Sequence, residues 1–362
     1  AEKTDWFRAL KNVDGIVPIA HSPGCGMAGD NEGYHTLFRT LQGYAKNPNF
    51  AGILLVGLGC EVLQIPALIG KARLRADGQF QHMTIQESGG TRRTVERGVE
   101  ALRELAQVAE ACQREPIPVS ELVIGMQCGG SDGYSGITAN PALGVSSDLL
   151  EAHGGTTILS ETSEIYGAEH LLTRRAVSVE VGEKLIDRIR WWEDYTARNK
   201  GEMDNNPSPG NKRGGLTTIL EKSLGAVAKG GSAPLQGVYL FAEPIDRKGF
   251  VFMDSPGYDP CSVTGQVASG ANLIVFTTGR GSVSGYKPVP CIKVATNTEM
   301  FTHMQEDMDL NTGDILEGVT LAEKGLELFE LMIRVASGEV TKSEALGFGG
   351  AEFVPWQIGA VM

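Results

Sequence analysis

The sequence predicts an α/β protein with two lobes, a flavodoxin-like parallel-sheet lobe over residues 1–205 and a smaller α/β lobe over residues 206–362. Apolar runs of strand length alternate with helical patterns up to about residue 180, as in repeated βαβ units. These runs are continuous rather than alternating, which is typical of strands covered on both faces. A turn-rich stretch, GEMDNNPSPGNKRGG at 201–215, separates the two patterns.

The first lobe is expected to hold five strands, each followed by a helix. The strands are predicted at 15–20, 53–59, 82–86, 122–127 and 156–160. The helices are predicted at 34–46, 61–75, 92–113, 140–153 and 163–175. A charged helix over 181–200 closes this lobe. The second lobe is expected to hold strands at 237–241, 250–253, 273–277 and 289–295, and a helix at 321–336.

Composition and charge narrow the class of protein. The chain has 362 residues and a net charge of -12, which argues against binding to a phosphate backbone. We find no apolar stretch of about 18 residues and no signal peptide at the start, so we expect neither a membrane span nor secretion. The six cysteines are then expected to be free thiols of a cytoplasmic protein.

Polar side chains follow each predicted strand, and parallel strands bring their carboxyl ends to one edge of a sheet. We therefore expect these side chains to converge. They are His21 and Cys25 after the first strand, Cys60 and Glu61 after the second, Glu87 and Ser88 after the third, Cys128, Ser131 and Asp132 after the fourth, and Glu161 and Glu164 after the fifth. The second lobe adds Asp254, Ser255 and Arg280 in the same kind of position.

Three of the six cysteines lie at this predicted edge. Cys25, Cys60 and Cys128 each stand next to glycine, and no CxxC pair exists anywhere in the chain, which excludes a zinc ribbon or a thioredoxin motif. Three dispersed thiolates with His21 nearby could hold one metal ion, or an iron–sulfur cluster with one open iron. Small cysteines that merely fit tight strand ends are the alternative interpretation.

Two further segments are candidates for binding an anionic ligand. NPSPGNKRGG, at 206–215, presents Asn211 and Lys212 among turn residues, although its composition also suits a linker. TTGRG places Arg280 in a glycine turn after a strand, a position that suits bidentate capture of a carboxylate or simple exposure to solvent. Lys222 follows on a predicted helix. The segment GLGCE is not a dinucleotide-binding motif, and no Walker loop is present.

Six segments together resemble the altronate/galactarate dehydratase family. They are HSPGCGM, NPNFAGILLVGLGCE, GMQCGGSDGYSGITANPALG, NPSPGNKRGG with EKSLG, VFTTGRG and IKVATNT, and they follow one another in the order seen in that family. The resemblance covers nearly the whole chain. It implies an iron-dependent hydro-lyase of sugar-acid catabolism, and one relative in the family removes sulfite from sulfolactate instead of water.

The chain departs from the family pattern near its start. Family members carry a small β-rich domain before the catalytic part and an Arg-Asn motif at the first strand, and neither is found here. The resemblance implies that the small domain is either part of a longer protein or a separate subunit. A homo-oligomer is also expected, with a small sugar acid as ligand.

The resemblance implies dehydration of a 2,3-dihydroxy acid to a 2-keto-3-deoxy acid. It implies Fe2+, with Mn2+ as a possible substitute, on Cys25, Cys60 and Cys128. The implied substrate-binding residues are Asn211, Lys212, Arg280, Ser131 and Asp132. The base is expected among His21, Glu61, Glu161 and Lys222, with His21 favoured because imidazole titrates near neutral pH. The alternatives are a sulfo-lyase that eliminates sulfite from 3-sulfolactate and a non-enzymatic module that binds sugar acids.

Overall fold

The computed structural model describes residues 1–72 and 79–359, with the side chains of residues 71 and 72 left out. The chain divides into two compact units. The first unit contains Ala1–Ile117 and Pro355–Met362, and the second contains Pro118–Val354. Both units combine helices with parallel strands, so the predicted α/β class is confirmed. Across the described ranges, no helix is both long enough and apolar enough to span a membrane.

The first unit is built around two parallel strands. Ile53 of β1 lies opposite Phe80 of β2, and α4 contacts both strands. Helix α4 presents Gly98, Ala101 and Leu105 at spacings of three and four residues, which places them on one buried face. The elements are α1 (Asp5–Arg8), α2 (Glu32–Lys46), β1 (Ile53–Gly57), α3 (Ile65–Ala72), β2 (Phe80–Thr84) and α4 (Thr91–Glu110).

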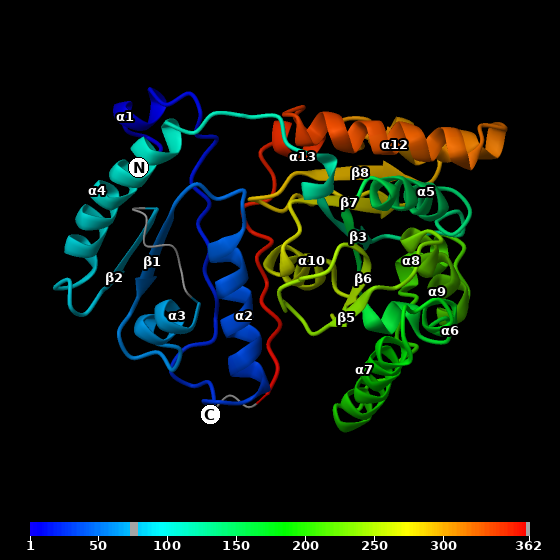
Figure 1. The fold of residues 1–362 in the computed structure, drawn as a ribbon, viewed down its shortest axis with the longest axis horizontal. Coiled ribbons are helices and arrows are strands. Elements are labelled where there is room, and N and C mark those ends of the chain that lie inside the picture. Colours follow the sequence, from blue (N-terminus) through cyan, green and yellow to red (C-terminus); the bar gives the residue numbers. More distant parts are fainter. Residues whose placement is uncertain (73–78, 360–362) are drawn as a thin grey trace. The chain divides into compact units, whose positions relative to one another are not determined.

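The second unit is built around a seven-stranded parallel sheet of order β5-β6-β4-β3-β7-β8-β9 (Figure 1). Its strands are β3 (Val123–Cys128), β4 (Thr156–Leu159), β5 (Gly237–Tyr239), β6 (Gly249–Met253), β7 (Leu273–Thr278), β8 (Cys291–Ala295) and β9 (Leu310–Asn311). The middle strands are buried along almost their whole length. All pairs are parallel, so the carboxyl ends of these strands lie along one edge.

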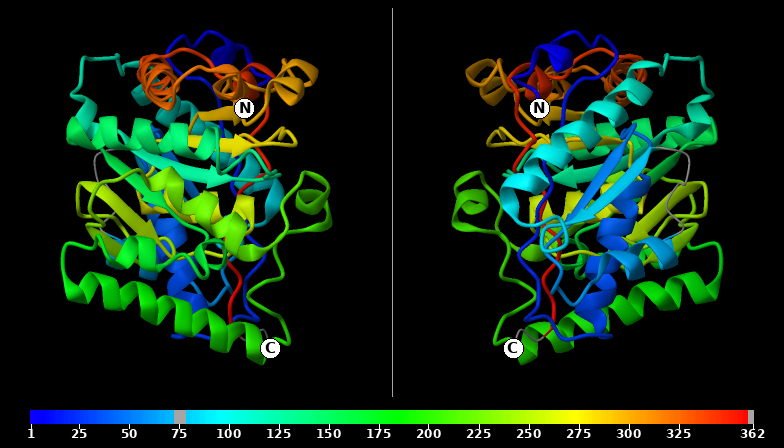
Figure 2. Two further views of the ribbon diagram at one scale, coloured as in Figure 1. Left: turned by 90° about the vertical axis from the view of Figure 1, so that its right-hand side faces the viewer. Right: turned by 90° about the vertical axis from the view of Figure 1, so that its left-hand side faces the viewer.

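Helices cover both faces of this sheet. Helix α5 (Ala139–Ala152) packs on β4 and β7, and α12 (Leu321–Ala336) packs on α5. Helix α10 (Asp259–Ser269) lies on the opposite face, so close to β3 that a side chain at Gly125 would meet Gln266. Helix α7 (Val179–Arg198) contacts β5 at one edge of the sheet, and Figure 2 shows it as a long green helix at the bottom of both views.

Shorter helices connect these elements. They are η1 (Val119–Glu121), η2 (Thr162–Ile165), α6 (His170–Thr173), α8 (Pro209–Arg213), α9 (Ile219–Val227), η3 (Ala228–Gly230), α11 (Thr298–His303), η4 (Gly313–Glu317) and α13 (Lys342–Ala345). Several begin with a side-chain cap, such as Thr218 at α9.

The observed division of the chain differs from the predicted boundary at 205/206. β4 pairs with β6 and β3 pairs with β7, so the sheet joins strands from before and after that boundary. Chain order could not reveal this, because backbone hydrogen bonds between distant strands decide which sheet a strand joins. As a result, polar groups that the prediction divided between two lobes lie in one unit.

Three predicted elements also differ. Residues 15–20 do not form a strand. The single helix expected at 163–175 is instead η2 and α6, because Gly167 adopts a φ of 83° that interrupts a helix. The helix expected at 61–75 begins at Ile65, and its last three residues lie outside the described ranges.

Candidate active site

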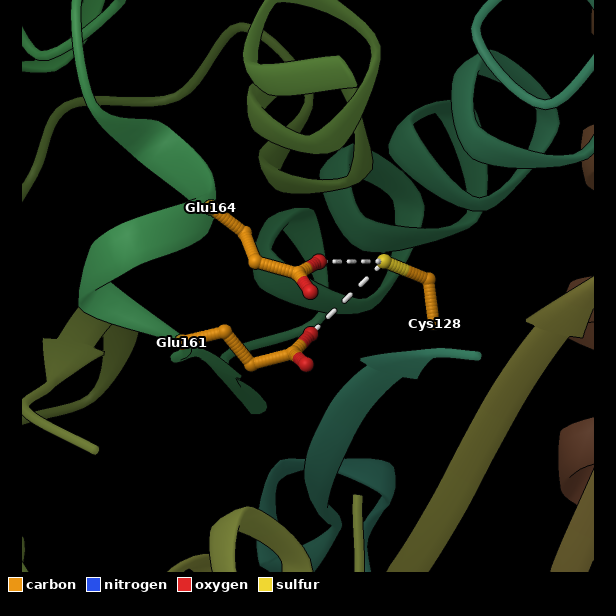
Figure 3. A group of neighbouring side chains, drawn as sticks. All are labelled: Cys128, Glu161 and Glu164. Atoms are coloured by element: carbon orange, nitrogen blue, oxygen red, sulfur yellow. Dashed lines mark hydrogen bonds between the residues drawn. The ribbon is translucent and has the colours of Figure 1, made fainter. Parts of the chain in front are cut away.

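A thiol and two carboxylates meet at the carboxyl ends of β3 and β4. Cys128 is the last residue of β3, Glu161 follows β4 by two residues, and Glu164 lies in η2. The Cys128 Sγ atom is 3.6 Å from Glu161 Oε2 and 3.4 Å from Glu164 Oε2 (Figure 3). One ligand atom from each of the three lies within 4.8 Å of the others. They meet because β3 and β4 are neighbours in the sheet.

Two buried lysines complete this group. Lys229 of η3 places Nζ 3.0 Å from Cys128 Sγ and 3.4 Å from Glu161 Oε2. Lys222 of α9 places Nζ 2.5 Å from Glu164 Oε1, which also accepts a hydrogen bond from Asn206 Nδ2 at 2.9 Å. Both lysine side chains are buried, so their ion pairs are little screened by water.

The turn that carries Lys229 is held by Arg175. Its guanidinium donates hydrogen bonds to the carbonyl oxygens of Gly230, Gly231 and Ala233, at 3.1, 2.7 and 2.9 Å. The same guanidinium stacks over the Phe250 ring at 4.7 Å. These hydrogen bonds hold the backbone just after Lys229 in place, and so help to position its side chain beside the thiol.

Burial shifts the protonation of the acidic members. Burial, together with the charge of Glu164, raises the pKa of Glu161 to about 8 against the pull of Lys229. Burial also raises the pKa of the Cys128 thiol, although Lys229 opposes it. Asp259, which accepts a hydrogen bond from Gln127 Nε2 at 2.8 Å, has its pKa raised by burial to about 6.

The lysines keep their protons. Burial works to lower the pKa of Lys229, but Cys128 and Glu161 outweigh it and the pKa is raised. Lys222 follows the same pattern, with Glu164 as the first of the charges that raise its pKa. The site therefore pairs two ammonium groups with one thiol and the two carboxyl groups of Glu161 and Glu164.

Glu161 is the least satisfied member of the group. Its Oε1 atom is buried and has no hydrogen-bond partner among the described residues. Its backbone adopts the left-handed conformation, with φ 69° and ψ 67°, which costs a non-glycine residue about 1 kcal/mol or more. A buried oxygen without a partner, on a strained backbone, is typical of a functional position rather than a structural one.

The donor types of this group suit a divalent metal ion. One thiol and two carboxylates each offer a ligand atom, and these atoms lie within 4.8 Å of one another. Sulfur together with carboxylate oxygen suits iron better than magnesium.

The three predicted metal ligands belong to both units of the chain. Cys128 has two glutamates as neighbours, whereas Cys25 and Cys60 are exposed residues of the first unit. Their convergence on Cys128 therefore stays a prediction.

His21 and Glu61 also belong to the first unit. Burial lowers the pKa of His21, and the charge of Glu61 opposes that shift. Glu61 Oε2 accepts the backbone N–H of Gly59 at 2.7 Å. Partial burial works to raise the pKa of Glu61. The backbone N–H of Gly59 and those of neighbouring residues outweigh burial, so the pKa is lowered. The imidazole is thus biased toward its neutral form and the carboxylate toward its charged form.

The five predicted substrate-binding residues separate into two kinds. Asp132 accepts hydrogen bonds from Thr296 Oγ1 at 2.9 Å and from Asn297 Nδ2 at 3.0 Å. Asn211 takes part in the capping box of α8 and donates to the Ser131 carbonyl oxygen at 2.9 Å. These three are buried and hydrogen-bonded within the chain, whereas Lys212 and Arg280 are exposed.

Sequence reasoning missed Lys229 entirely and gave Glu164 and Asp259 no role. The available signal for Lys229 was a lysine within an apolar and glycine-rich stretch, GAVAKGGS, just past a predicted helix. A lysine in such a stretch is expected to be buried and paired, because a charged residue is seldom buried without a partner. The partner itself, Cys128, is 101 residues away and could not be inferred.

Buried titratable groups at the carboxyl ends of neighbouring parallel strands are typical of the active site of an α/β enzyme. The model of the family described as D-galactarate/Altronate dehydratase, C-terminal, matches residues 119–361. A second model, D-galactarate dehydratase/Altronate hydrolase, second domain, matches residues 1–110. The chain belongs to this dehydratase family, and the boundary between the two matches agrees with the division of the structure.

Curated relatives agree with this assignment. The chain is 39% identical over 336 residues to altronate dehydratase of Bacillus subtilis, and the match covers 92% of this chain and 66% of that protein. It is 41% identical over 308 residues to galactarate dehydratase (L-threo-forming) of Escherichia coli, and this match covers 83% of this chain and 59% of that protein. It is 35% identical over 342 residues to (2R)-sulfolactate sulfo-lyase subunit beta of Chromohalobacter salexigens, with 93% of this chain and 86% of that protein covered. The chain thus spans less than two thirds of the length of the first two relatives.

Proposed function

We propose that this chain carries the catalytic machinery of a hydro-lyase that removes water from a sugar acid of the altronate or galactarate type. The observation that supports this best is the buried group formed by Cys128, Glu161, Glu164, Lys222 and Lys229. The names of the relatives supply the substrate class.

Glu161 takes the proton from C2 of the substrate and passes it to the hydroxyl group that leaves C3, so that water is lost. The resulting enol becomes the 2-keto acid by gaining a proton at C3 from water and losing its hydroxyl proton to water. The Glu161 pKa of about 8 lies close to physiological pH, where a general acid–base group works best. As the C2 proton leaves, negative charge develops on the substrate carboxylate. The ammonium groups of Lys222 and Lys229 stabilise that charge in surroundings of low dielectric constant.

Cys128 and Glu164 would hold a divalent iron ion, with manganese as a substitute, while Glu161 beside them stays free to move a proton. When bound, this ion supplies a Lewis acid for the carboxylate and for the departing hydroxyl group. An iron–sulfur cluster with one open iron is the alternative, and it would need Cys25 and Cys60 as well.

The exposed cations bind the substrate. Lys212 on α8 and Arg280 after β7 are the two predicted binding residues whose charged side chains face solvent, and a sugar acid carries one or two carboxylates. Arginine can bind one of these through two parallel hydrogen bonds. His21 and Glu61 remain proposed alternatives for the base.

Turnover assays test this proposal. The chain is purified without oxygen, loaded with Fe2+, and offered galactarate, altronate and 3-sulfolactate, while 2-keto acid and sulfite are measured. We expect 2-keto acid from one of the two sugar acids, and a Glu161→Gln variant serves as the matched control. Sulfite from sulfolactate would support the sulfo-lyase alternative instead, the activity named for one of the relatives. Sugar-acid binding without any product would instead make the chain a binding module.

The same relative bears on the expected partner. It is named as subunit beta and is covered over 86% of its length. We therefore propose that a small separate chain, or a small domain of a longer protein, assembles with this one.

A further inference from the structure

The turn that carries Glu161 and Glu164 is fastened to the end of a neighbouring strand. Glu161 donates its backbone N–H to Ser255 Oγ at 3.0 Å, and Thr162 donates its backbone N–H to the Ser255 carbonyl oxygen at 2.9 Å. In return, Ser255 donates its backbone N–H to Thr162 Oγ1 at 3.4 Å. The turn after β4 and the loop after β6 are therefore joined by reciprocal hydrogen bonds.

Asp254 is the centre of this junction. Its carboxylate follows β6, is 1% exposed, and accepts hydrogen bonds from Thr162 Oγ1 at 2.5 Å and from Trp192 Nε1 at 2.7 Å. The other carboxylate oxygen lies 2.8 Å from Nη2 of Arg188 on α7. A carboxylate buried this deeply needs such partners, because desolvation otherwise disfavours its charge.

Arg188 is itself held in place. Its guanidinium lies over the Trp191 ring at 4.5 Å, and its side chain is 14% exposed. The planar guanidinium suits both the carboxylate and the stacked ring, which a lysine would not. Helix α7 therefore presents one indole N–H and one guanidinium to the Asp254 carboxylate, which accepts the hydrogen bond from the Thr162 hydroxyl.

We propose that Asp254, supported by Arg188 and Trp192, is a positioning residue that fixes the Glu161–Glu164 turn through the Thr162 hydroxyl. Asp254 contacts no atom of the thiol, carboxylate and lysine group in any recorded hydrogen bond or ion pair between described residues. It acts through Thr162, the residue next to Glu161. Glu164 follows the same turn, because its N–H bonds to the Glu161 carbonyl oxygen at 2.7 Å.

The left-handed backbone of Glu161 explains why such a fastening is needed. A residue with a positive φ relaxes to an ordinary conformation unless its neighbours prevent this. If the Thr162 hydroxyl is lost, the turn is free to relax and the spacing between Glu161 and Glu164 changes. Errors of about 1 Å in the position of catalytic groups cost roughly 100-fold in rate.

A pair of substitutions at one position tests the proposal, which rests on the proposed dehydratase function. Thr162→Val keeps the shape of the side chain and removes the hydroxyl, whereas Thr162→Ser keeps the hydroxyl. We expect Thr162→Val to lower kcat by about 10- to 100-fold with little change in KM. We expect Thr162→Ser to stay close to the wild type. Asp254→Asn should repeat the loss seen in Thr162→Val.

Hydrogen exchange provides a readout that does not depend on activity. Amide exchange in a peptide spanning residues 156–166 should speed up in Thr162→Val and not in Thr162→Ser. Thr312→Val is the matched control, because Thr312 is fully buried and its hydroxyl donates to the Ala295 carbonyl oxygen at 2.6 Å, at the far edge of the sheet. It should lower the thermal midpoint and leave both kcat and that peptide unchanged.

Each outcome decides something definite. Equal kcat and equal exchange in the valine and serine variants would overturn the proposal. So would a loss of kcat in Thr312→Val as large as that in Thr162→Val, since it would trace the effect to general destabilisation. If the wild type turns over no sugar acid, the proposed function fails, while the exchange comparison still decides whether the Thr162 hydroxyl holds the turn.

Discussion

Two buried acidic side chains follow neighbouring strands of the same sheet, Asp132 after β3 and Glu161 after β4. The carboxylate of Asp132 accepts hydrogen bonds from Thr296 Oγ1, Asn297 Nδ2 and Ser135 Oγ, at 2.9 to 3.0 Å. It ties the loop after β3 to the loop after β8. These hydrogen bonds all serve the fold.

Glu161 is buried as completely but is satisfied only in part. Its Oε2 atom lies near Lys229 and Cys128, while Oε1 has no partner in the described part of the chain. Its pKa is raised to about 8 by burial and by Glu164. The comparison teaches that burial of an acid does not by itself indicate chemistry. The balance of hydrogen-bond donors around it separates a structural carboxylate from a reactive one.

The largest expected effect is on activity, at Glu161. Glu161→Gln keeps the size of the side chain and cannot take up a proton, so we expect kcat to fall by about 100- to 10,000-fold. The thermal midpoint should change little, because a carboxyl with a pKa of about 8 is mostly protonated at neutral pH and is replaced by an amide of the same size. Steady-state kinetics with the sugar acid and thermal unfolding measure the two quantities. A variant that keeps its activity would assign the proton transfer to another residue, with His21 tested next.

Asp132→Ala should show the opposite pattern. It leaves several buried donors without an acceptor, and we expect a loss of about 3 kcal/mol in the free energy of unfolding. Urea unfolding measures that loss, and assays well below the thermal midpoint should still find turnover. If the variant instead unfolds like the wild type but has a raised KM, Asp132 binds substrate as the sequence analysis expected.

Asp259 combines a hydrogen-bond donor, as Asp132 has, with a raised pKa, as Glu161 has, so its contribution to stability depends on pH. Burial raises its pKa from 3.8 to about 6, so the folded protein holds a proton that the unfolded chain has released between those values. Stability from this group is fully present below about pH 4 and is lost as pH rises towards 6, in total about 3 kcal/mol. Asp259→Asn, which can still accept from Gln127, should therefore lose less stability than the wild type over that window. Urea unfolding at several pH values tests this, and parallel curves for the two proteins would contradict it.

The smallest expected effect comes from α8, where a buried structural residue and an exposed candidate for substrate binding are neighbours in the chain. Asn211 is buried and hydrogen-bonded to Ser131 and Ser208, whereas the neighbouring Lys212 is exposed. Lys212→Ala should raise KM about 10-fold, the value of one charge-assisted hydrogen bond, with an unchanged thermal midpoint. Asn211→Ala should lower the midpoint instead. Equal KM values for Lys212→Ala and the wild type would place Lys212 outside the substrate site.

Much of the fold was predictable because strand and helix patterns are local. Strands β3, β4, β6 and β7 lie within two residues of their predicted bounds, and α12 spans the predicted 321–336. The strand predicted at 15–20 was wrong: none of these residues is buried, and an apolar run forms a strand only where it pairs with another strand. The two-residue strand β9 has no signal of its own, because pairing with β8 alone defines it.

Part of the candidate site was predictable for the same reason. The parallel-sheet pattern was enough to mark Cys128 and Glu161 as strand-end residues, and Lys222 was singled out on its helix. Lys229 and the pairing of Glu164 with Lys222 could not be predicted, because their partners come from separate elements. The hydrogen bonds of Asp132 and Asn211 could not be predicted either, because their partners come from other loops.

By itself, the sequence determined the α/β class, most of the elements, the family resemblance and the strand ends where polar groups collect. These follow from local periodicity and from motifs contiguous in the chain. Only the tertiary structure decided that β3 and β4 join the later strands in one sheet, and that a thiol, two glutamates and two lysines share one buried space. Protonation and hydrogen-bond balance depend on distances between residues far apart in the chain, and only folding sets those distances.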